Sequence, residues 1–313
     1  MQASGKPGMN GPKPMRILRL SLRAAAACLA AVASPAFADG ARDWVNAPIN
    51  MNFLYAYYAY SNSDTSFDTA LPVEGASVDV HLPILRYARS MNIGGRAGGI
   101  QLVVPYAVVN ATLDGTDREV SHNGFGDIQA AFISNIFGAP ALAMPEFMKA
   151  KPEAYLTGSI WVTAPTGSYN EDRAVNIGKN RWVFKPQLSY GVPVGTGGLF
   201  AVNANTQLFT TNNNGWLDRK LGQKPLWGLE GHFSQNLNRA FWLSADAYYA
   251  VGGETRVNHE GQNNSQSTLR LGVSGSLNVT PVNAIAFQFS NSVAKRDHTP
   301  NSTSFSINFS HIW

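Results

Sequence analysis

The chain has 313 residues, with 24 Lys and Arg against 20 Asp and Glu, one Cys and only 14% charged residues. Soluble domains average roughly 25% charged residues, so this surface is short of the groups that normally face water. Five of the basic residues lie before residue 24, and no Asp or Glu precedes Asp39, so the net charge of +4 is concentrated near the N-terminus.

Residues 1–38 have the pattern of a cleaved secretory signal peptide. A basic region precedes a short run of small apolar residues, and Ala36 and Ala38 stand two positions apart before Asp39. This pattern predicts export and cleavage after Ala38. Met15 is an alternative start, because a more usual signal begins there.

Removal of the leader changes the charge and the cysteine content. The remaining 275 residues carry 19 basic and 20 acidic side chains, a net charge of −1, and no Cys. Nucleic-acid binders need a concentrated basic face, so we expect no nucleic-acid partner. A chain without Cys has no disulfide framework and no thiolate chemistry. Two classes remain, a soluble exported β protein and an outer-membrane β-barrel.

After the leader, apolar and polar residues alternate in many short segments. In one of them, Trp182, Phe184 and Leu188 alternate with Lys185 and Gln187. A period of two predicts strands with one apolar and one polar face. We expect twelve such strands, at 48–60, 76–89, 97–110, 126–138, 153–165, 181–193, 198–210, 225–237, 239–251, 267–279, 284–295 and 303–313.

The connections between these strands alternate in length. Residues 139–152 are the exception, a longer Pro-containing stretch where a short turn is expected. Alternation puts every long loop at one end of a meander, as in outer-membrane barrels. We therefore predict an all-β fold, with 48–313 forming one transmembrane antiparallel up-and-down β-barrel of about 12 strands, and both ends of the mature chain in the periplasm. The long connections, rich in Asn, Asp, Gly and Ser, are 61–75, 111–125, 166–180, 211–224, 252–266 and 296–302.

The last predicted strand has a pattern typical of outer-membrane proteins. Phe305, Ile307 and Phe309 alternate with polar residues, and the sequence ends on Trp313. A final strand of this kind resembles the C-terminal signal by which Gram-negative barrels are recognised for insertion. We therefore expect an outer-membrane location in a Gram-negative bacterium, with the barrel-assembly machinery and membrane lipid as partners.

Other aromatic residues are predicted to form girdles at the two membrane interfaces. Trp182 and Trp227 lie near the loop ends of their strands, and Trp242 lies near a turn. The first strand gives weaker support, because aromatic strands are also common in soluble sheets. Its tyrosines are Tyr55, Tyr57, Tyr58 and Tyr60.

Two stretches carry a more specific pattern, G-x-G-D and P-T-G-x-Y…N-x-G-x-N-R-W. They resemble elements of the MetA-pathway of phenol degradation family, bacterial outer-membrane proteins regarded as transporters, and the resemblance covers roughly 50–313. Ser168 stands where the family often has Asp. The resemblance implies uptake of small, often hydrophobic or aromatic molecules. The motif residues are Gly124, Gly126, Asp127, Pro165, Thr166, Gly167, Tyr169, Asn176, Gly178, Asn180, Arg181 and Trp182.

The motif glycines suit tight extracellular turns, because glycine tolerates positive φ. Neither motif is a phosphate-binding fingerprint, since no helix follows whose N-terminus would receive the anion. The motifs therefore either shape the loops or contact the solute.

If the apolar residues face lipid, the alternate residues face the lumen. In that set, four acids and three fixed bases nearly cancel, whereas a strongly ion-selective pore needs one dominant sign. We expect a narrow lumen with salt bridges and a preference for neutral solutes, or charges that only brace the barrel. Residues 39–47 form either a partial plug of the lumen or an ordinary disordered N-terminus. The candidate lumen-lining residues are Asp79, His81, Asp127, Arg181, Lys185, Glu230, His232, Asp246 and Arg270.

Catalysis and metal binding have little support. His232 and Ser234 resemble the His-x-Ser arrangement of the outer-membrane phospholipase, but Gln235 interrupts the continuation found there. A nucleophilic Ser also needs a base that a third group orients, and the sequence indicates none. No His-Glu-x-x-His motif occurs. We expect no catalytic residue, metal or cofactor. The main alternative to transport is a structural or adhesin-like barrel that binds a partner through its long loops.

Overall fold

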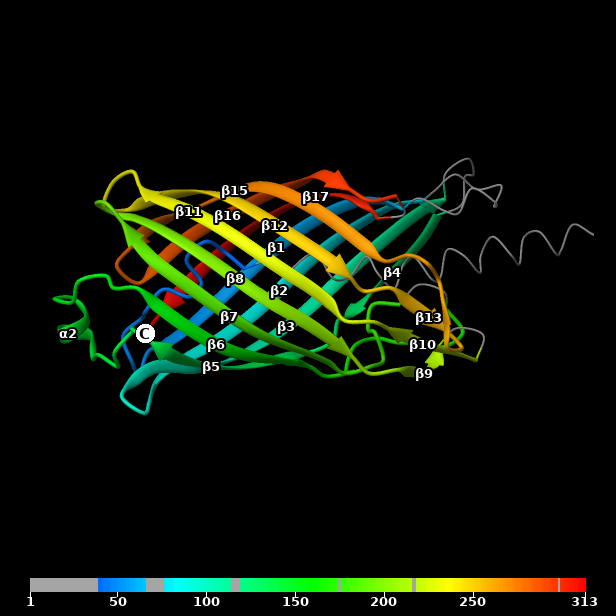
Figure 1. Cartoon of the computed structure of the whole chain (residues 1–313), viewed down its shortest axis with the longest axis horizontal. Coiled ribbons are helices and arrows are strands. Elements are labelled where there is room, and N and C mark those ends of the chain that lie inside the picture. The colour runs from blue at the N-terminus through cyan, green and yellow to red at the C-terminus, as the bar shows by residue number, and fades with distance from the viewer. Residues whose placement is uncertain (1–38, 66–75, 114–118, 174–175, 216–217, 298) are drawn as a thin grey trace, which may run out of the picture.

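The computed structural model describes residues 39–65, 76–113, 119–173, 176–215, 218–297 and 299–313, and within them 12 antiparallel crossings form one closed barrel (Figure 1). β4 and β5 both pair with β3 and make one interrupted crossing. The strands of the wall are β1 (Asn52–Thr65), β2 (Ala76–Ile93), β3 (Arg96–Leu113), β4 (Glu119–Phe125), β5 (Gln129–Phe137), β6 (Tyr155–Thr163), β7 (Val183–Val194), β8 (Gly198–Phe209), β11 (Leu226–Asn236), β12 (Phe241–Gly252), β15 (Gln266–Thr280), β16 (Asn283–Lys295) and β17 (Asn301–Ile312).

The barrel closes where its first and last strands meet. β1 and β17 pair antiparallel, beginning with Phe53 opposite Ile312. The backbones of Asn52 and Trp313 exchange two hydrogen bonds, of 2.9 and 3.1 Å. This seam pairs the first strand with the last, as a sheet in hydrocarbon requires because no water is there to bond the backbone. The predicted 12-stranded antiparallel barrel is confirmed.

Long and short connections lie at opposite ends of the barrel (Figure 1). One end carries the long loops and a small second sheet, and by analogy with other barrels it is the extracellular end. The other, periplasmic end carries the C-terminus and the short helix α2 (Met144–Phe147), which lies within the exceptional connection at 139–152. Among the described residues, no helix has the length and apolar character to span a membrane. The strands of the second sheet are β9 (Asn212–Gly215), β10 (Arg219–Gln223), β13 (Thr255–Val257) and β14 (Glu260–Gly261).

The outer face of the wall is apolar all the way round. Large apolar side chains project from every crossing and stay exposed, for example Leu85, Ile160, Leu229 and Val273, which are 52%, 55%, 50% and 49% exposed. Soluble proteins rarely expose a contiguous apolar patch larger than a few hundred Å². A closed sheet with such a belt is a membrane-spanning barrel, and the polar alternate residues face its lumen.

The structure corrects one of the three girdle predictions. Trp182 and Trp227 face outward and are 44% and 57% exposed. Trp242 instead faces the lumen, where the Arg42 guanidinium lies 5.0 Å from the centre of its ring. Trp242 does lie near a turn, as the prediction assumed. Side chains alternate along β12, and because Ser244 is buried inside the barrel, Trp242 faces the lumen as well.

The tyrosines of β1 are divided between its two faces. Tyr58 is 44% exposed on the outer face. Tyr55 and Tyr57 line a cavity inside the barrel. Half of this aromatic strand therefore belongs to the lumen and not to an interfacial girdle.

An arginine on the lipid face is expected to destabilise the barrel according to its depth. Leu229 lies on β11 between the exposed rings of Trp227 and Phe233, and Leu229→Arg is expected to lower the free energy of unfolding by about 2–4 kcal/mol. Leu237→Arg, in the periplasmic turn, is the control and should cost well under half as much. Urea unfolding in lipid vesicles, followed by tryptophan fluorescence, measures both. Equal costs would contradict the placement of Leu229 in hydrocarbon.

Candidate functional site

One side of the lumen is lined by apolar side chains. A single cluster of buried apolar residues follows the inner face of β1–β3, β5 and β6, with partly buried neighbours that include Ile177 of the loop before β7. The members of the cluster are Trp44, Ala59, Leu82, Ile84, Val103, Ala107, Ala131, Ala139, Tyr155, Trp161 and Leu199. The cluster reaches from a periplasmic segment to an extracellular loop, so an apolar surface follows much of the lumen.

The opposite side of the lumen is polar. Buried hydroxyl, amide and charged side chains alternate along β8, β11, β12 and β15–β17. They are Asn203, Glu230, His232, Ser234, Ser244, Asp246, Arg270, Ser274, Ser290, Ser302 and Ser310. The row of serines carries no charge and gives no distinctive sequence signal beyond strand alternation.

Two of the nine predicted lumen residues lie on the other face of the wall. Asp79 and His81 lie on β2, opposite outward-facing residues of β1. Tyr58 Oη, on that outer face, lies 2.7 Å from His81 Nδ1. The prediction fails because β2 is apolar on both faces. Val80 and Leu82 face inward while Leu85 faces lipid, so polarity alone assigned the faces the wrong way round.

The other seven predicted residues lie inside the barrel, and three of them form one network. His232, 1% exposed, has its Nδ1 2.8 Å from Asp246 Oδ1 and its Nε2 3.6 Å from Glu230 Oε2. The Ser244 hydroxyl donates to Asp246 at 2.7 Å, and Asn203 donates to Glu230 at 3.1 Å. The network braces β8, β11 and β12 against one another.

This geometry does not support a nucleophile and base. The Ser234 hydroxyl accepts a hydrogen bond of 2.9 Å from Arg42 Nε. His232 is engaged by carboxylates on both nitrogens. Among the described residues, no group of three or more His, Cys, Asp and Glu side chains is placed to hold a metal ion.

The family-like motifs assemble around one carboxylate. Asp127 lies in the break between β4 and β5, and its two oxygens accept hydrogen bonds from the backbone N–H groups of Gly167 (2.9 Å) and Lys179 (2.8 Å). Thr166 Oγ1 accepts from the N–H of Ile128 at 3.0 Å. Asp127 therefore fastens the loop 164–182 to the wall.

The rest of the second motif holds the same loop to its neighbours. The Asn176 side chain bonds the backbone of Asn170 in both directions, at 2.8 and 3.0 Å. The Tyr169 hydroxyl donates to Asn214 O at 2.8 Å, and Asn180 Nδ2 donates to Asn212 Oδ1 at 3.0 Å. These contacts are ones that shape loops.

Close packing, and not positive φ, explains the motif glycines. Neither Gly167 nor Gly178 has a positive φ. A Cβ on Gly167 would lie 2.8 Å from the Asp127 nitrogen, and one on Gly178 would lie 2.8 Å from the Gly167 carbonyl carbon. Real side chains do not tolerate such distances, so the expected reason for these glycines is corrected.

Arg181 and Arg270 are both buried and both stacked on aromatic rings. Arg181 lies 4.6 Å from the Phe209 ring centre and donates to Gln223. Burial lowers the pKa of Arg181 to about 10, and the charge of Asp127 opposes that shift. Arg270 lies 5.4 Å from the ring centre of Tyr248.

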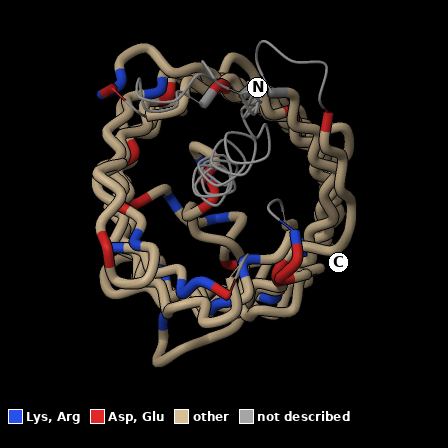
Figure 2. Tube along the Cα trace, turned by 90° about the vertical axis from the view of Figure 1, so that its right-hand side faces the viewer, with Lys and Arg blue, Asp and Glu red and all other residues tan. Residues whose placement is uncertain are grey.

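Residues 39–47 lie inside the barrel, between the apolar and the polar side of the lumen. Arg42 donates to Asn236 Oδ1 at 2.7 Å and to Gly197 O at 3.1 Å, in addition to Ser234. Asp43 Oδ2 lies 3.5 Å from Arg86 Nη1. Figure 2, a view along the barrel, shows chain segments within the ring of the wall.

Asp39 adds a third anchor to this segment. Its carboxylate accepts hydrogen bonds from Trp44 Nε1 at 2.8 Å and from Gln187 Nε2. At the periplasmic end, Ile49 N donates to Leu142 O at 2.9 Å. The exceptional connection at 139–152 thus supports the segment where it enters the lumen.

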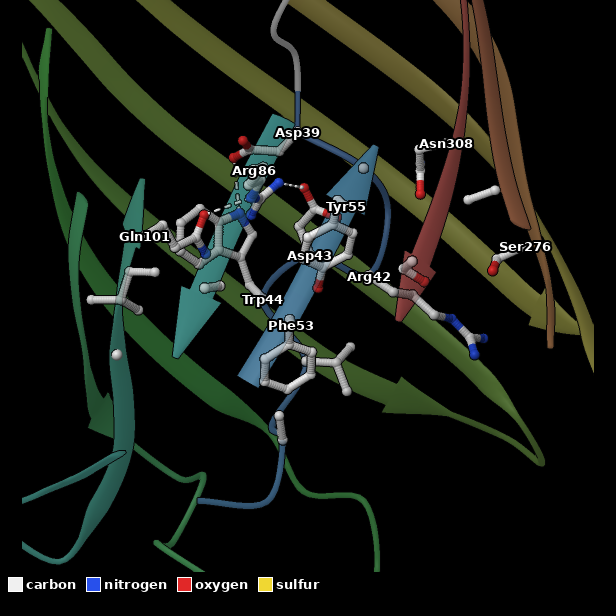
Figure 3. A pocket seen from close by; sticks show the side chains of 18 of the residues that line it. Asp39, Arg42, Asp43, Trp44, Phe53, Tyr55, Arg86, Gln101, Ser276 and Asn308 are labelled. Carbon is white, nitrogen blue, oxygen red and sulfur yellow. Dashed lines mark hydrogen bonds and ion pairs between the residues drawn. The ribbon is translucent and has the colours of Figure 1, made fainter. Parts of the chain in front are cut away.

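A cavity of about 680 Å³ lies between this segment and the wall (Figure 3). Figure 3 shows Asp39, Asp43 and Arg86 gathered on one side and Ser276 and Asn308 on the other. This volume is within the range of about 300–1,000 Å³ typical of ligand pockets. The cavity is the candidate solute site.

The residues of the C-terminal pattern face away from this site. Phe305, Ile307, Phe309 and Trp313 are between 40% and 52% exposed, on the outer face of the wall. They belong to the apolar belt and its periplasmic rim.

Comparison with known proteins places this architecture among outer-membrane proteins. The model of the family described as "Putative MetA-pathway of phenol degradation" matches residues 60–309. No curated protein has significant sequence similarity to the chain.

Solved structures share the barrel. The COG4313 outer membrane channel from Pseudomonas putida F1 is 18% identical, with 88% of this chain and 100% of that chain covered and a TM-score of 0.76. The translocator domain of the autotransporter NalP from Neisseria meningitidis is 11% identical, with coverages of 90% and 92% and a TM-score of 0.51. The β domain of the Bordetella autotransporter BrkA is 11% identical, with coverages of 84% and 100% and a TM-score of 0.53. At these identities the likeness concerns the fold.

Removal of the fully buried histidine is expected to cost more stability than removal of a partly buried one. His232→Ala would leave the carboxylates of Glu230 and Asp246 buried without their partner, a change that costs about 3–5 kcal/mol when a buried ion pair is broken. His311→Ala is the control, because His311 contacts the neutral residues Asn283 and Trp313 and no carboxylate among the described residues. Unfolding in urea measures both variants. Equal costs would show that His232 does not balance the two acids.

Loss of the Asp127 carboxylate is expected to release the loop 164–182. Asp127→Ala leaves two backbone N–H groups without an acceptor, at about 1–3 kcal/mol each. Trypsin should then cleave after Arg173 several-fold faster in reconstituted protein. Asp172→Ala, an exposed carboxylate of the same loop, should cleave like the parent. Unchanged cleavage of the Asp127 variant would mean that the carboxylate does not hold the loop.

Proposed function

The chain belongs to the MetA-pathway of phenol degradation family, and we propose that it is a channel through which small hydrophobic or aromatic molecules cross the outer membrane. The observation that carries this proposal is the apolar side of the lumen. Ordinary porin lumens are polar and filled with water. Here a cluster of apolar side chains lies along the inner face of the wall, from Ile177 to Trp44.

The two-sided lumen suits solutes that are themselves two-sided. An aromatic ring gains by leaving water for the apolar wall, at about 25 cal/mol per Å² of buried surface. A hydroxyl or carboxyl substituent keeps hydrogen-bond partners on the serine-rich wall. A purely polar solute gains nothing from the first wall.

Residues 39–47 serve in this proposal as a plug that narrows the periplasmic half of the channel. The plug is held by hydrogen bonds and an ion pair, of Arg42, Asp39 and Asp43, and by the ring of Trp44, which packs in the apolar cluster. Residues 39–47 belong to no strand of the wall, so the plug can leave the lumen without breaking the hydrogen bonds of the barrel sheet. Cleavage of the leader after Ala38 would make Asp39 the first residue of the plug.

The C-terminal strand has a separate role in assembly. We propose that its outward residues Phe305, Ile307, Phe309 and Trp313 are recognised by the barrel-assembly machinery before the β1–β17 seam closes. Their exposure on the outer face makes them available to a partner in the membrane.

Deletion of the plug is expected to open the channel. Protein that begins at Pro48, produced without the leader and refolded into liposomes, should pass a small aromatic solute several-fold faster than protein that begins at Asp39. The reason is that removal of 39–47 joins the cavity to the periplasmic mouth. Heat-modifiable migration on a gel is the control for an intact barrel. Equal flux would refute the plug, and no flux from either protein would favour the structural, adhesin-like alternative.

A further inference from the structure

Both acids that line the cavity, Asp39 and Asp43, come from the plug, which also contributes the cation Arg42. The inner face of the barrel wall contributes the cations Arg86 and Lys185. Positive and negative charges nearly cancel along the whole lumen. At the cavity, however, the wall by itself carries an excess of positive charge. In the closed state the plug neutralises that charge with its own carboxylates.

Arg86 is the best placed of these cations to receive an anion. Its Nε donates to Gln101 Oε1 at 2.7 Å, and its Nη1 donates to Tyr57 Oη at 3.3 Å. These bonds fix the guanidinium with its side chain only 14% exposed. A guanidinium has five N–H donors in a planar fork that matches a carboxylate.

The contact between Asp43 and Arg86 leaves room for a better partner. Its distance is 3.5 Å, and the Asp43 side chain is 33% exposed to the cavity. Charge-assisted hydrogen bonds between Arg and a carboxylate are normally about 2.7–2.9 Å long and often bidentate. A free carboxylate is not restrained by a chain and can reach that geometry.

Aromatic faces surround the same guanidinium. Arg86 lies 5.2 Å from the ring centre of Tyr55 and 5.9 Å from that of Trp161, and Lys185 Nζ lies 5.2 Å from the Trp161 ring. Trp161 is 7% exposed, and among the described residues its indole N–H has no hydrogen-bond partner. Buried polar groups in proteins nearly always have a partner, and this unpaired donor belongs to a ring that lines the cavity.

The far wall of the cavity is polar and uncharged. Ser276 and Asn308 lie there, opposite Arg86 and Tyr55 (Figure 3). Arg42, the one cation of the plug in this lining, is turned toward Asn236 and Trp242. The cavity thus offers a cation, aromatic faces and neutral polar groups in that order across its width.

We propose that this cavity is a receptor for small aromatic carboxylates, whose anionic group replaces Asp43 at Arg86. The ring of the solute lies against Tyr55 and Trp161, and Asp43 acts as an internal mimic of the solute until it is displaced. Displacement breaks the ion pair between Asp43 and Arg86 that helps to hold the plug, so the solute promotes its own passage. This inference rests on the proposed channel function and adds the class of solute and the trigger.

Release of the plug is measured by the reactivity of a buried position. Ala41 is 2% exposed in the plug, and the single native cysteine is removed by Cys28→Ser, so Ala41→Cys reports on the plug alone. In nanodiscs, benzoate should raise the rate of maleimide labelling at least several-fold, whereas benzyl alcohol and acetate should not. Equal rates with benzoate and benzyl alcohol would overturn the proposal.

Variants test the receptor residue. Arg86→Gln in the Ala41→Cys protein should label at one rate with and without benzoate. Arg270→Gln is the matched control, a buried arginine stacked on Tyr248 that does not line this cavity, and it should keep the benzoate response. If Arg86→Gln fails to form a heat-modifiable barrel, Lys185→Gln takes its place, with a weakened response expected. A full response in the folded variants would overturn the proposal.

Flux measurements separate this inference from the function on which it rests. If benzoate crosses liposomes faster than benzyl alcohol through the parent protein and not through Arg86→Gln, the receptor is supported. If both solutes cross equally in both proteins, the receptor fails and the aromatic channel stands. If neither solute crosses, the channel itself fails and the receptor fails with it.

Discussion

Every backbone N–H and C=O group of a sheet in hydrocarbon must be bonded within the protein, because the membrane core has no water to bond it. The seam between β1 and β17 meets this requirement and turns a meander into a closed wall. In the complete wall, the outer face contacts lipid. Residues that serve a particular function therefore lie in the lumen and the loops. The apolar belt outside and the varied surface inside both follow from that one closure.

Inside the wall, one side of the lumen is mainly polar and the other mainly apolar. The network of His232, Glu230 and Asp246 braces the polar side and holds its charges in mutual contact. The apolar side holds Arg86, which bonds Gln101, and its apolar contacts reach the plug at Trp44. Arg86 lies where the apolar side, the aromatic rings and the plug meet, which is why its loose ion pair with Asp43 is the natural point of control.

The number and order of the strands could be predicted from the sequence, but the residues that face the lumen could be predicted only in part. Period-two alternation and loop lengths are local properties, and lipid enforces them strongly, so the twelve crossings were recognisable. The inner face is under no such uniform rule. On β2, apolar Val80 and Leu82 turn inward, and polarity therefore assigned Asp79 and His81 to the wrong face. The partners of the plug could not be predicted at all, since Arg42 meets residues about 190 positions away.

If the lumen is a route for aromatic molecules across the outer membrane, cells that lack this protein take them up more slowly. The most direct measurement is the initial rate of uptake of a radiolabelled aromatic compound, at low external concentration, by cells with and without this protein. We expect uptake to fall several-fold when the protein is absent and to be restored by the parent gene supplied on a plasmid. Equal uptake by both cells would contradict it.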